Sequence, residues 1–156
     1  MKRSLILSSC FALLFCACKK HNDNNDSTTS SWIFGGITYN AETVLYDSAL
    51  RNLSALKYGG RSGPKGAVSF GFATAPTGNG QMLITNSSLP NTVGVGASTL
   101  SGTTTTYYIS GETNVNANIM ITNGKISVSF PGTIWMHNLG DPNDSVQLSV
   151  GTITQQ

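Results

Sequence analysis

Apolar and polar residues alternate on both sides of Asn123-Gly124, and this pattern predicts a β-hairpin. Asn-Gly strongly favours a two-residue type I′ turn, because both turn positions need a positive φ. A turn there places Ile121 opposite Ile126 and Ile119 opposite Val128. Side chains alternate between the two faces of a strand, so a slip of one residue would bury the polar set. The apolar face of this hairpin is predicted to hold Val115, Ala117, Ile119, Ile121, Ile126, Val128 and Phe130.

A second hairpin is predicted where Gly35-Gly36 separates two short runs of β-prone residues, 32–34 and 37–39. A turn at the two glycines places Trp32 opposite Tyr39. An aromatic cross-strand pair of this kind stabilises a sheet by a few tenths to about 1 kcal/mol.

The rest of the chain also consists of short β-prone runs separated by turn residues. The alternation in 68–72 predicts a half-buried strand, whereas the glycines within 93–96 predict an edge strand. The leucines in 47–57 leave a helix there as an alternative to a turn followed by a strand. Further strands are predicted at 42–46, 52–58, 82–85, 103–110, 133–137 and 146–150. This spacing predicts an all-β domain, an antiparallel β-sandwich of roughly eight to ten short strands, with a β-barrel as the alternative.

The N-terminal segment differs in composition from the rest of the chain. Lys2 and Arg3 precede a short apolar run at 5–17, whereas a membrane span needs about 20 apolar residues. These features predict a signal peptide over 1–17. Residues 21–31 contain no apolar side chain, which is typical of a disordered tether. We therefore expect a tether over 18–31 and an all-β domain over 32–156.

The string Phe15-Cys16-Ala17-Cys18 resembles the lipoprotein signal of bacteria, in which a peptidase cuts before a lipid-bearing cysteine. The resemblance implies that Cys18 is acylated, and two or more acyl chains anchor a protein stably in membrane lipid. Lys19 and Lys20, followed by a polar tract, are similar to lipoproteins of the Bacteroidota, whose envelope holds lipid-anchored sandwich domains of unknown function. The resemblance implies an outer-membrane lipoprotein on the periplasmic or the surface side, and an ordinary secretory signal is the alternative.

Charge and cysteine content narrow the classes of function. The formal net charge is +2 at pH 7, and Lys2 and Arg3 in the leader account for it. Nucleic-acid binding needs an excess of clustered basic residues, so we expect no nucleic-acid partner. All three cysteines lie in the leader or at the predicted anchor, which leaves the domain without disulfides or thiol ligands. We expect no cofactor and no metal.

The glycine-rich stretch 59–66 carries Arg61 and Lys65. It lacks the G-x-x-x-x-G-K-[ST] spacing by which a P-loop holds phosphates. We therefore expect a solvated turn at 59–66.

Few residues are candidates for catalysis. His137 is the single histidine of the predicted domain and could act as a general base or a ligand, but no G-x-S-x-G string indicates a nucleophile. Glu42 with Glu112, or Asp141 with Asp144, could supply the two carboxylates of a glycosidase. Acidic side chains in turns more often stabilise the turn itself. We expect that the protein is not an enzyme.

Aromatic residues are the candidates for a ligand platform. Trp135, Tyr107 and Tyr108 are the candidate ligand-binding residues, since exposed aromatic rings on a sandwich would stack on sugar rings. Tyr107 and Tyr108 are adjacent on a predicted strand, so one points inward and the other outward. The alternative is that the aromatics pack in the core and its rim. We expect a non-enzymatic binding or structural module, or a carbohydrate-binding sandwich, with a glycan or an envelope protein as partner.

One short motif recurs three times. The triplets that begin at Asp26, Asp47 and Asp144 resemble the Asp-Ser/Thr-aliphatic acceptor motif for O-glycosylation in envelope proteins of the Bacteroidota. All three fall in segments predicted as tether or turn. The candidate O-glycosylation sites are Ser27, Ser48 and Ser145.

Overall fold

The computed structural model describes residues 30–60, 63 and 65–156, and all the regular structure that it describes is β-strand. The predicted signal peptide over 1–17, the acylation site Cys18, the glycosylation candidate Ser27 and nearly all of the tether lie outside the described residues. The strands are β1 Ser31–Phe34, β2 Ile37–Asn40, β3 Thr43–Asp47, β4 Asn52–Lys57, β5 Lys65–Phe72, β6 Gly80–Ile84, β7 Thr92–Ser101, β8 Thr104–Ser110, β9 Asn116–Thr122, β10 Lys125–Ser129, β11 Thr133–Asn138, β12 Ser145–Val150 and β13 Ile153–Thr154.

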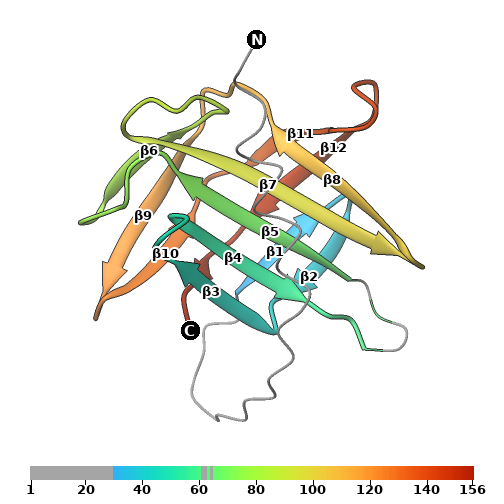
Figure 1. Cartoon of the computed structure of the whole chain (residues 1–156), viewed down its shortest axis with the longest axis horizontal. Helices are drawn as coiled ribbons and strands as arrows, with labels where there is room; N and C mark the ends of the chain where they lie inside the picture. Colours follow the sequence, from blue (N-terminus) through green and yellow to red (C-terminus); the bar gives the residue numbers. More distant parts are fainter. Residues whose placement is uncertain (1–29, 61–62, 64) are drawn as a thin grey trace.

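The strands form one hydrogen-bonded sheet that folds over itself into two layers (Figure 1). The strand order is β13-β10-β9-β6-β7-β8-β11-β12-β1-β2, and β3, β4 and β5 branch from β7. In Figure 1 the strands β4, β5 and β7 cross in front of β1, β10 and β12 at a steep angle, as in orthogonal sheet packing. The pairing is antiparallel except between β6 and β7, which makes the sheet mixed. The strands do not close into a barrel, and the predicted sandwich-like all-β fold is confirmed. The predicted number of strands, roughly eight to ten, is too low, because the described residues form thirteen.

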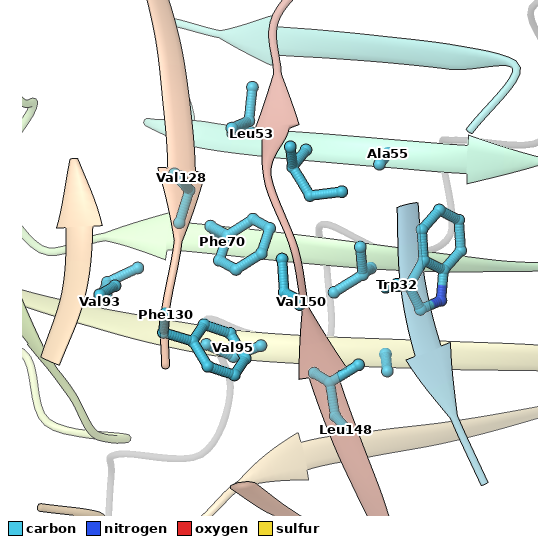
Figure 2. Close-up of a cluster of buried hydrophobic side chains, with 14 of the residues drawn as sticks. Trp32, Leu53, Ala55, Phe70, Val93, Val95, Val128, Phe130, Leu148 and Val150 are labelled. Atoms are coloured by element: carbon cyan, nitrogen blue, oxygen red, sulfur yellow. The ribbon is translucent and has the colours of Figure 1, made fainter. Parts of the chain in front are cut away.

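The hydrophobic core lies between the two layers. Phe70 of β5 and Leu53 of β4 point from one layer toward Val128 of β10 and Val150 of β12 in the other (Figure 2). All four side chains are buried. Burying a large apolar side chain stabilises the folded state by about 1.5–3 kcal/mol. The core therefore determines which face of each strand points inward.

The hairpin at Asn123-Gly124 is confirmed in its turn and in its register. Asn123 has a φ of 54° and Gly124 a φ of 76°, as a type I′ turn requires. Ile121 lies opposite Ile126. The predicted apolar face is buried or half-buried along both β9 and β10.

The Gly35-Gly36 hairpin is confirmed as well. Trp32 pairs with Tyr39, and the two buried rings stack with centroids 5.2 Å apart and planes 5° from parallel. Gly66 of β5 makes room for this stack. A Cβ at Gly66 would lie 3.0 Å from Tyr39 Cε1 and 2.7 Å from the Ser98 carbonyl oxygen.

Two strand predictions are wrong in their burial. The stretch 68–72 is not half-buried, because Ala67 and Ser69 on the second face of β5 are buried along with Val68 and Phe70. The stretch 93–96 is not at an edge, because β7 pairs with β5, β6 and β8. In both cases the small Ala, Ser and Gly residues, which resemble those of a solvated or edge strand, belong to strands at the centre of the sheet.

The helix considered over 47–57 is replaced by a turn and β4. The Asp47 carboxylate accepts the backbone N–H groups of Ala49 and Leu50, at 2.9 and 3.0 Å, and Arg51 adopts a φ of 52° before the strand begins. The loop predicted over 59–66 is also shorter than expected. Arg61 lies outside the described residues, while Lys65 and the residue after it already belong to β5.

Candidate ligand-binding face

The hairpin of β11 and β12 separates its side chains into a buried and an exposed set. Ile134, Met136 and Leu148 point into the core and are almost fully buried. The opposite side of the hairpin is polar apart from one indole. We call this side the Trp135 face, and it consists of Thr133, Trp135 and His137 of β11 with Ser145, Gln147 and Ser149 of β12.

Trp135 projects from this face with 55% of its surface exposed. It pairs directly across the strands with Gln147, so an amide lies beside the indole. A groove of about 240 Å³ runs next to it, which we call the Trp135 groove. Its lining residues come from the β8–β9 connection and from β11: Gly111, Glu112, Thr113, Val115, Thr133, Ile134, Trp135 and His137.

The pairing of β8 with β11 builds this groove. His137 of β11 lies opposite Ile109 of β8. After β8 ends, the chain continues through Gly111 and passes close to the imidazole of His137. A Cβ at Gly111 would lie 3.4 Å from His137 Nε2, so the glycine lets the connection pass close to the ring. Glu112 follows directly, is exposed, and lines the groove beside Trp135.

His137 has a hydroxyl partner that the sequence analysis did not identify. Its Nδ1 lies 2.8 Å from Ser145 Oγ, across the β11–β12 pair. A histidine beside a serine is part of the geometry of acyl-transfer enzymes, which also need groups that orient the imidazole and stabilise an oxyanion. In the described part of the chain this pair is an exposed cross-strand hydrogen bond, and it orients the imidazole along the Trp135 face.

The two neighbouring tyrosines point to opposite sides, as predicted. Tyr108 is buried and packs edge-on against Phe34, with ring centroids 5.0 Å apart, so it is not available as a surface platform. Its hydroxyl donates a hydrogen bond of 2.8 Å to Asp144 Oδ2. Burial, reinforced by this carboxylate, raises the pKa of Tyr108.

Tyr107 is half-buried on the outward side of β8. Its carbonyl oxygen accepts the N–H of Leu139, four residues after Trp135. At about 3.3 Å per residue, the two aromatic positions are about 13 Å apart along the strand direction. Trp135 and Tyr107 therefore stand near the two ends of one outward-facing strip.

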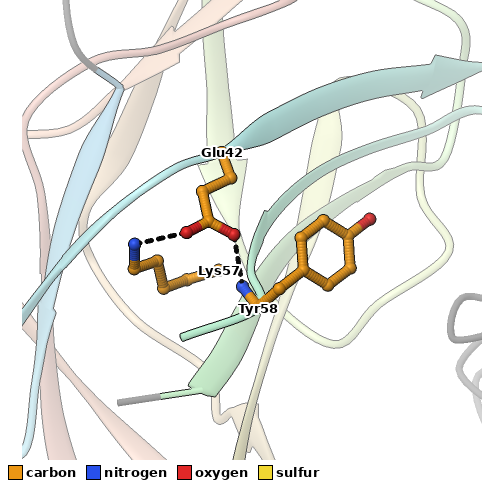
Figure 3. Close-up of polar contacts among 3 residues, drawn as sticks. All are labelled: Glu42, Lys57 and Tyr58. Atoms are coloured by element: carbon orange, nitrogen blue, oxygen red, sulfur yellow. Dashed lines mark hydrogen bonds and ion pairs between the residues drawn. The ribbon is translucent and has the colours of Figure 1, made fainter. Parts of the chain in front are cut away.

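Three of the four predicted glycosidase carboxylates, those of Glu42, Asp141 and Asp144, make structural contacts. Glu42 bridges Lys57 Nζ, at 2.5 Å, and the backbone N–H of Tyr58, at 2.9 Å (Figure 3). The hydrogen bond from Lys57 lowers the pKa of Glu42. Among the described residues, Glu112 is the only carboxylate that lines the Trp135 groove, whereas the two-carboxylate mechanism needs a second one across the substrate.

Asp141 and Asp144 hold the turn between β11 and β12. Asp141 Oδ1 accepts the N–H of Asn143, and Asp144 Oδ2 accepts Asn138 Nδ2 at 2.8 Å in addition to the Tyr108 hydroxyl. The hydrogen bonds from Asn138 and then Tyr108 lower the pKa of Asp144. The turn-stabilising interpretation of these acids is confirmed.

The glycosylation candidates within the described residues have different surroundings. Ser48 lies exposed in the turn after β3. Ser145 is half-buried at the first position of β12, rather than in the predicted turn, because its pairing with His137 begins the strand. Their modification stays a prediction.

Comparisons with known proteins add no assignment. No protein family matches the sequence, and no curated protein or solved structure is significantly similar to it. In the described part of the chain, no three His, Cys, Asp or Glu side chains gather as a metal site would require. The same residues include no helix with the length and apolar character to cross a membrane.

Proposed function

We propose that this chain is a non-enzymatic binding module, held at a bacterial outer membrane by lipid on Cys18, and that its Trp135 face binds carbohydrate. The observation that carries the proposal is the exposure of Trp135 beside the Trp135 groove. Folding favours burial of an indole, as the almost fully buried Trp32 illustrates in the same sheet. An exposed indole beside a groove with a few convergent polar groups is the usual candidate for a binding site.

The chemistry of the face suits a sugar. A pyranose has one face rich in C–H groups and a rim of hydroxyls, so it needs a flat apolar surface with hydrogen-bonding groups beside it. Trp135 supplies the flat surface, and His137, Gln147 and Glu112 supply polar groups around it. Tyr107 lies along the same outward strip, which suits a short oligosaccharide better than a single sugar.

Intrinsic fluorescence tests the proposal directly, because the chain has two tryptophans. Trp32 is buried and Trp135 is exposed, so acrylamide should quench mainly Trp135. We expect a bound oligosaccharide to protect the full chain, purified in detergent, from quenching. Binding of a glycan from an array without any change in Trp135 quenching would contradict the proposed site, and an array that captures nothing would contradict the proposed function.

The anchor has a separate test. The basic residues before the apolar run at 5–17 and the cysteine at position 18 support it. Cells given an alkyne-bearing fatty acid should label the wild-type protein and not Cys18→Ala, which should leave the membrane fraction. Protease treatment of intact cells would then show the side: removal of the domain means surface display, and protection means a periplasmic position.

A further inference from the structure

The acidic side chains of the described domain fall into two groups. Four of them have hydrogen-bond partners in turns or between strands: Glu42, Asp47, Asp141 and Asp144. Among the described residues, Glu112 is the acid for which no hydrogen bond or ion pair is found. The fold therefore uses the other carboxylates for its own stability and leaves this one in the Trp135 groove.

The surroundings of Glu112 disfavour a negatively charged ligand. The residues that line the Trp135 groove include no Lys and no Arg. A bound anion would face the Glu112 carboxylate, and the only other ionisable side chain of the described lining is the His137 imidazole. A second groove of about 290 Å³, formed by β1, β12 and the β10–β11 connection, has no ionisable lining residue at all. Charge selection can thus arise at the Trp135 groove and not at the second groove.

We infer that Glu112 determines the specificity of this site, which takes neutral glycans and rejects acidic ones. The inference rests on the proposed carbohydrate-binding function. Sugar hydroxyls donate to the carboxylate while a ring face stacks on Trp135, and hydrogen bonds to an ionised acceptor are about twice as strong as neutral ones. A uronate or sulfate about 5 Å from Glu112 would weaken binding roughly 5- to 100-fold, according to how far water screens the pair.

The test uses glycans that differ only at C6, where the uronate carries a carboxylate in place of the CH₂OH group. The probes are oligosaccharides of glucan, mannan and galactan, each paired with its polyuronate of the same linkage and length. The full chain in detergent should bind at least one neutral oligosaccharide, and its uronate counterpart at least about fivefold more weakly. In Glu112→Gln we expect the neutral affinity to fall severalfold and the two affinities to come within about twofold of each other. High salt should narrow the wild-type ratio as well, because it screens the carboxylate.

Two further variants show whether a negative result contradicts the role of Glu112 or the proposed glycan binding itself. Glu42→Gln makes the same chemical change outside the groove and should leave the wild-type selectivity unchanged. Trp135→Ala should lose both glycans. If Trp135→Ala loses binding while Glu112→Gln keeps the wild-type ratio, or if the wild type prefers the uronate, the inference about Glu112 is wrong and the glycan function stands. If no probe binds the wild type, the proposed function is wrong.

Discussion

Two hairpins of similar construction differ in what their outer faces carry. Both β9–β10 and β11–β12 bury one apolar side against the core, with Ile119 and Val128 in the first and Met136 and Leu148 in the second. The outer side of β9–β10 is solvated and carries one exposed apolar residue, Met120. The outer side of β11–β12 carries an exposed indole beside a groove lined by Glu112, which has no partner among the described residues.

The difference shows which parts of the sheet are constrained by folding. The inner sides must be apolar because the core depends on them, and their patterns are alike. The outer sides contribute little to the core, so their residues reflect other requirements. The exposed indole of Trp135, next to Glu112 and His137, is the feature of β11–β12 that core packing does not explain.

The largest predicted effect separates the inner from the outer side of one hairpin. Leu148→Ala should lower the free energy of unfolding by about 2–5 kcal/mol, because it opens a cavity among packed side chains. Trp135→Ala, on the other side, should change it by less than about 1 kcal/mol. Urea unfolding of both variants checks this, and a Trp135→Ala loss as large as that of Leu148→Ala would mean that Trp135 is structural.

A smaller effect is expected at the turn of β9–β10. Gly124 has a positive φ and Gly78 does not, while a Cβ at either position would meet no atom within 4 Å. Gly124→Ala should therefore destabilise the protein by about 1–2 kcal/mol through backbone strain alone. Gly78→Ala should be neutral or slightly stabilising, because it restricts the unfolded chain. Equal thermal midpoints for the two variants would contradict the type I′ turn.

The smallest predicted effect is a pH dependence of stability, which we expect at the β11–β12 turn and not at the Asn123-Gly124 turn. Asp144 holds the β11–β12 turn with a lowered pKa, whereas the Asn123-Gly124 turn contains no acid. A lowered folded-state pKa stabilises the protein above the pKa of the unfolded chain, near 4, and this stabilisation disappears as the pH falls through the folded value. The wild type should melt slightly above Asp144→Asn at pH 7, and the difference should shrink as the pH falls below about 4. A difference that grows in acid would contradict this assignment.

Local features were predictable from the sequence, and features that depend on distant segments were not. The Asn123-Gly124 hairpin follows from a turn dipeptide and its flanking alternation, all within one short stretch. The position of β7 could not be predicted, because its glycines indicate an edge and its partners β5 and β8 lie elsewhere in the chain.

The candidate site shows the same division. Trp135 was a candidate platform residue from the sequence because it is aromatic, with packing in the core or its rim as the alternative. The approach of Glu112 depends on the pairing of β8 with β11, and the contact between His137 and Ser145 depends on the turn that joins β11 to β12. Neither segment contains a signal for the other, so the groove appears only when the strands are paired.

The most direct test of the account compares the outer faces of the two hairpins. Trp135 and Met120 are equally exposed, at 55%, and each lies on the outer side of its hairpin. Calorimetric titration of the full chain with the glycan of highest affinity should show loss of binding in Trp135→Ala and wild-type affinity in Met120→Ala, with both variants folded. Wild-type affinity in Trp135→Ala, or an equal loss in the two variants, would contradict the assignment of the Trp135 face as the binding face.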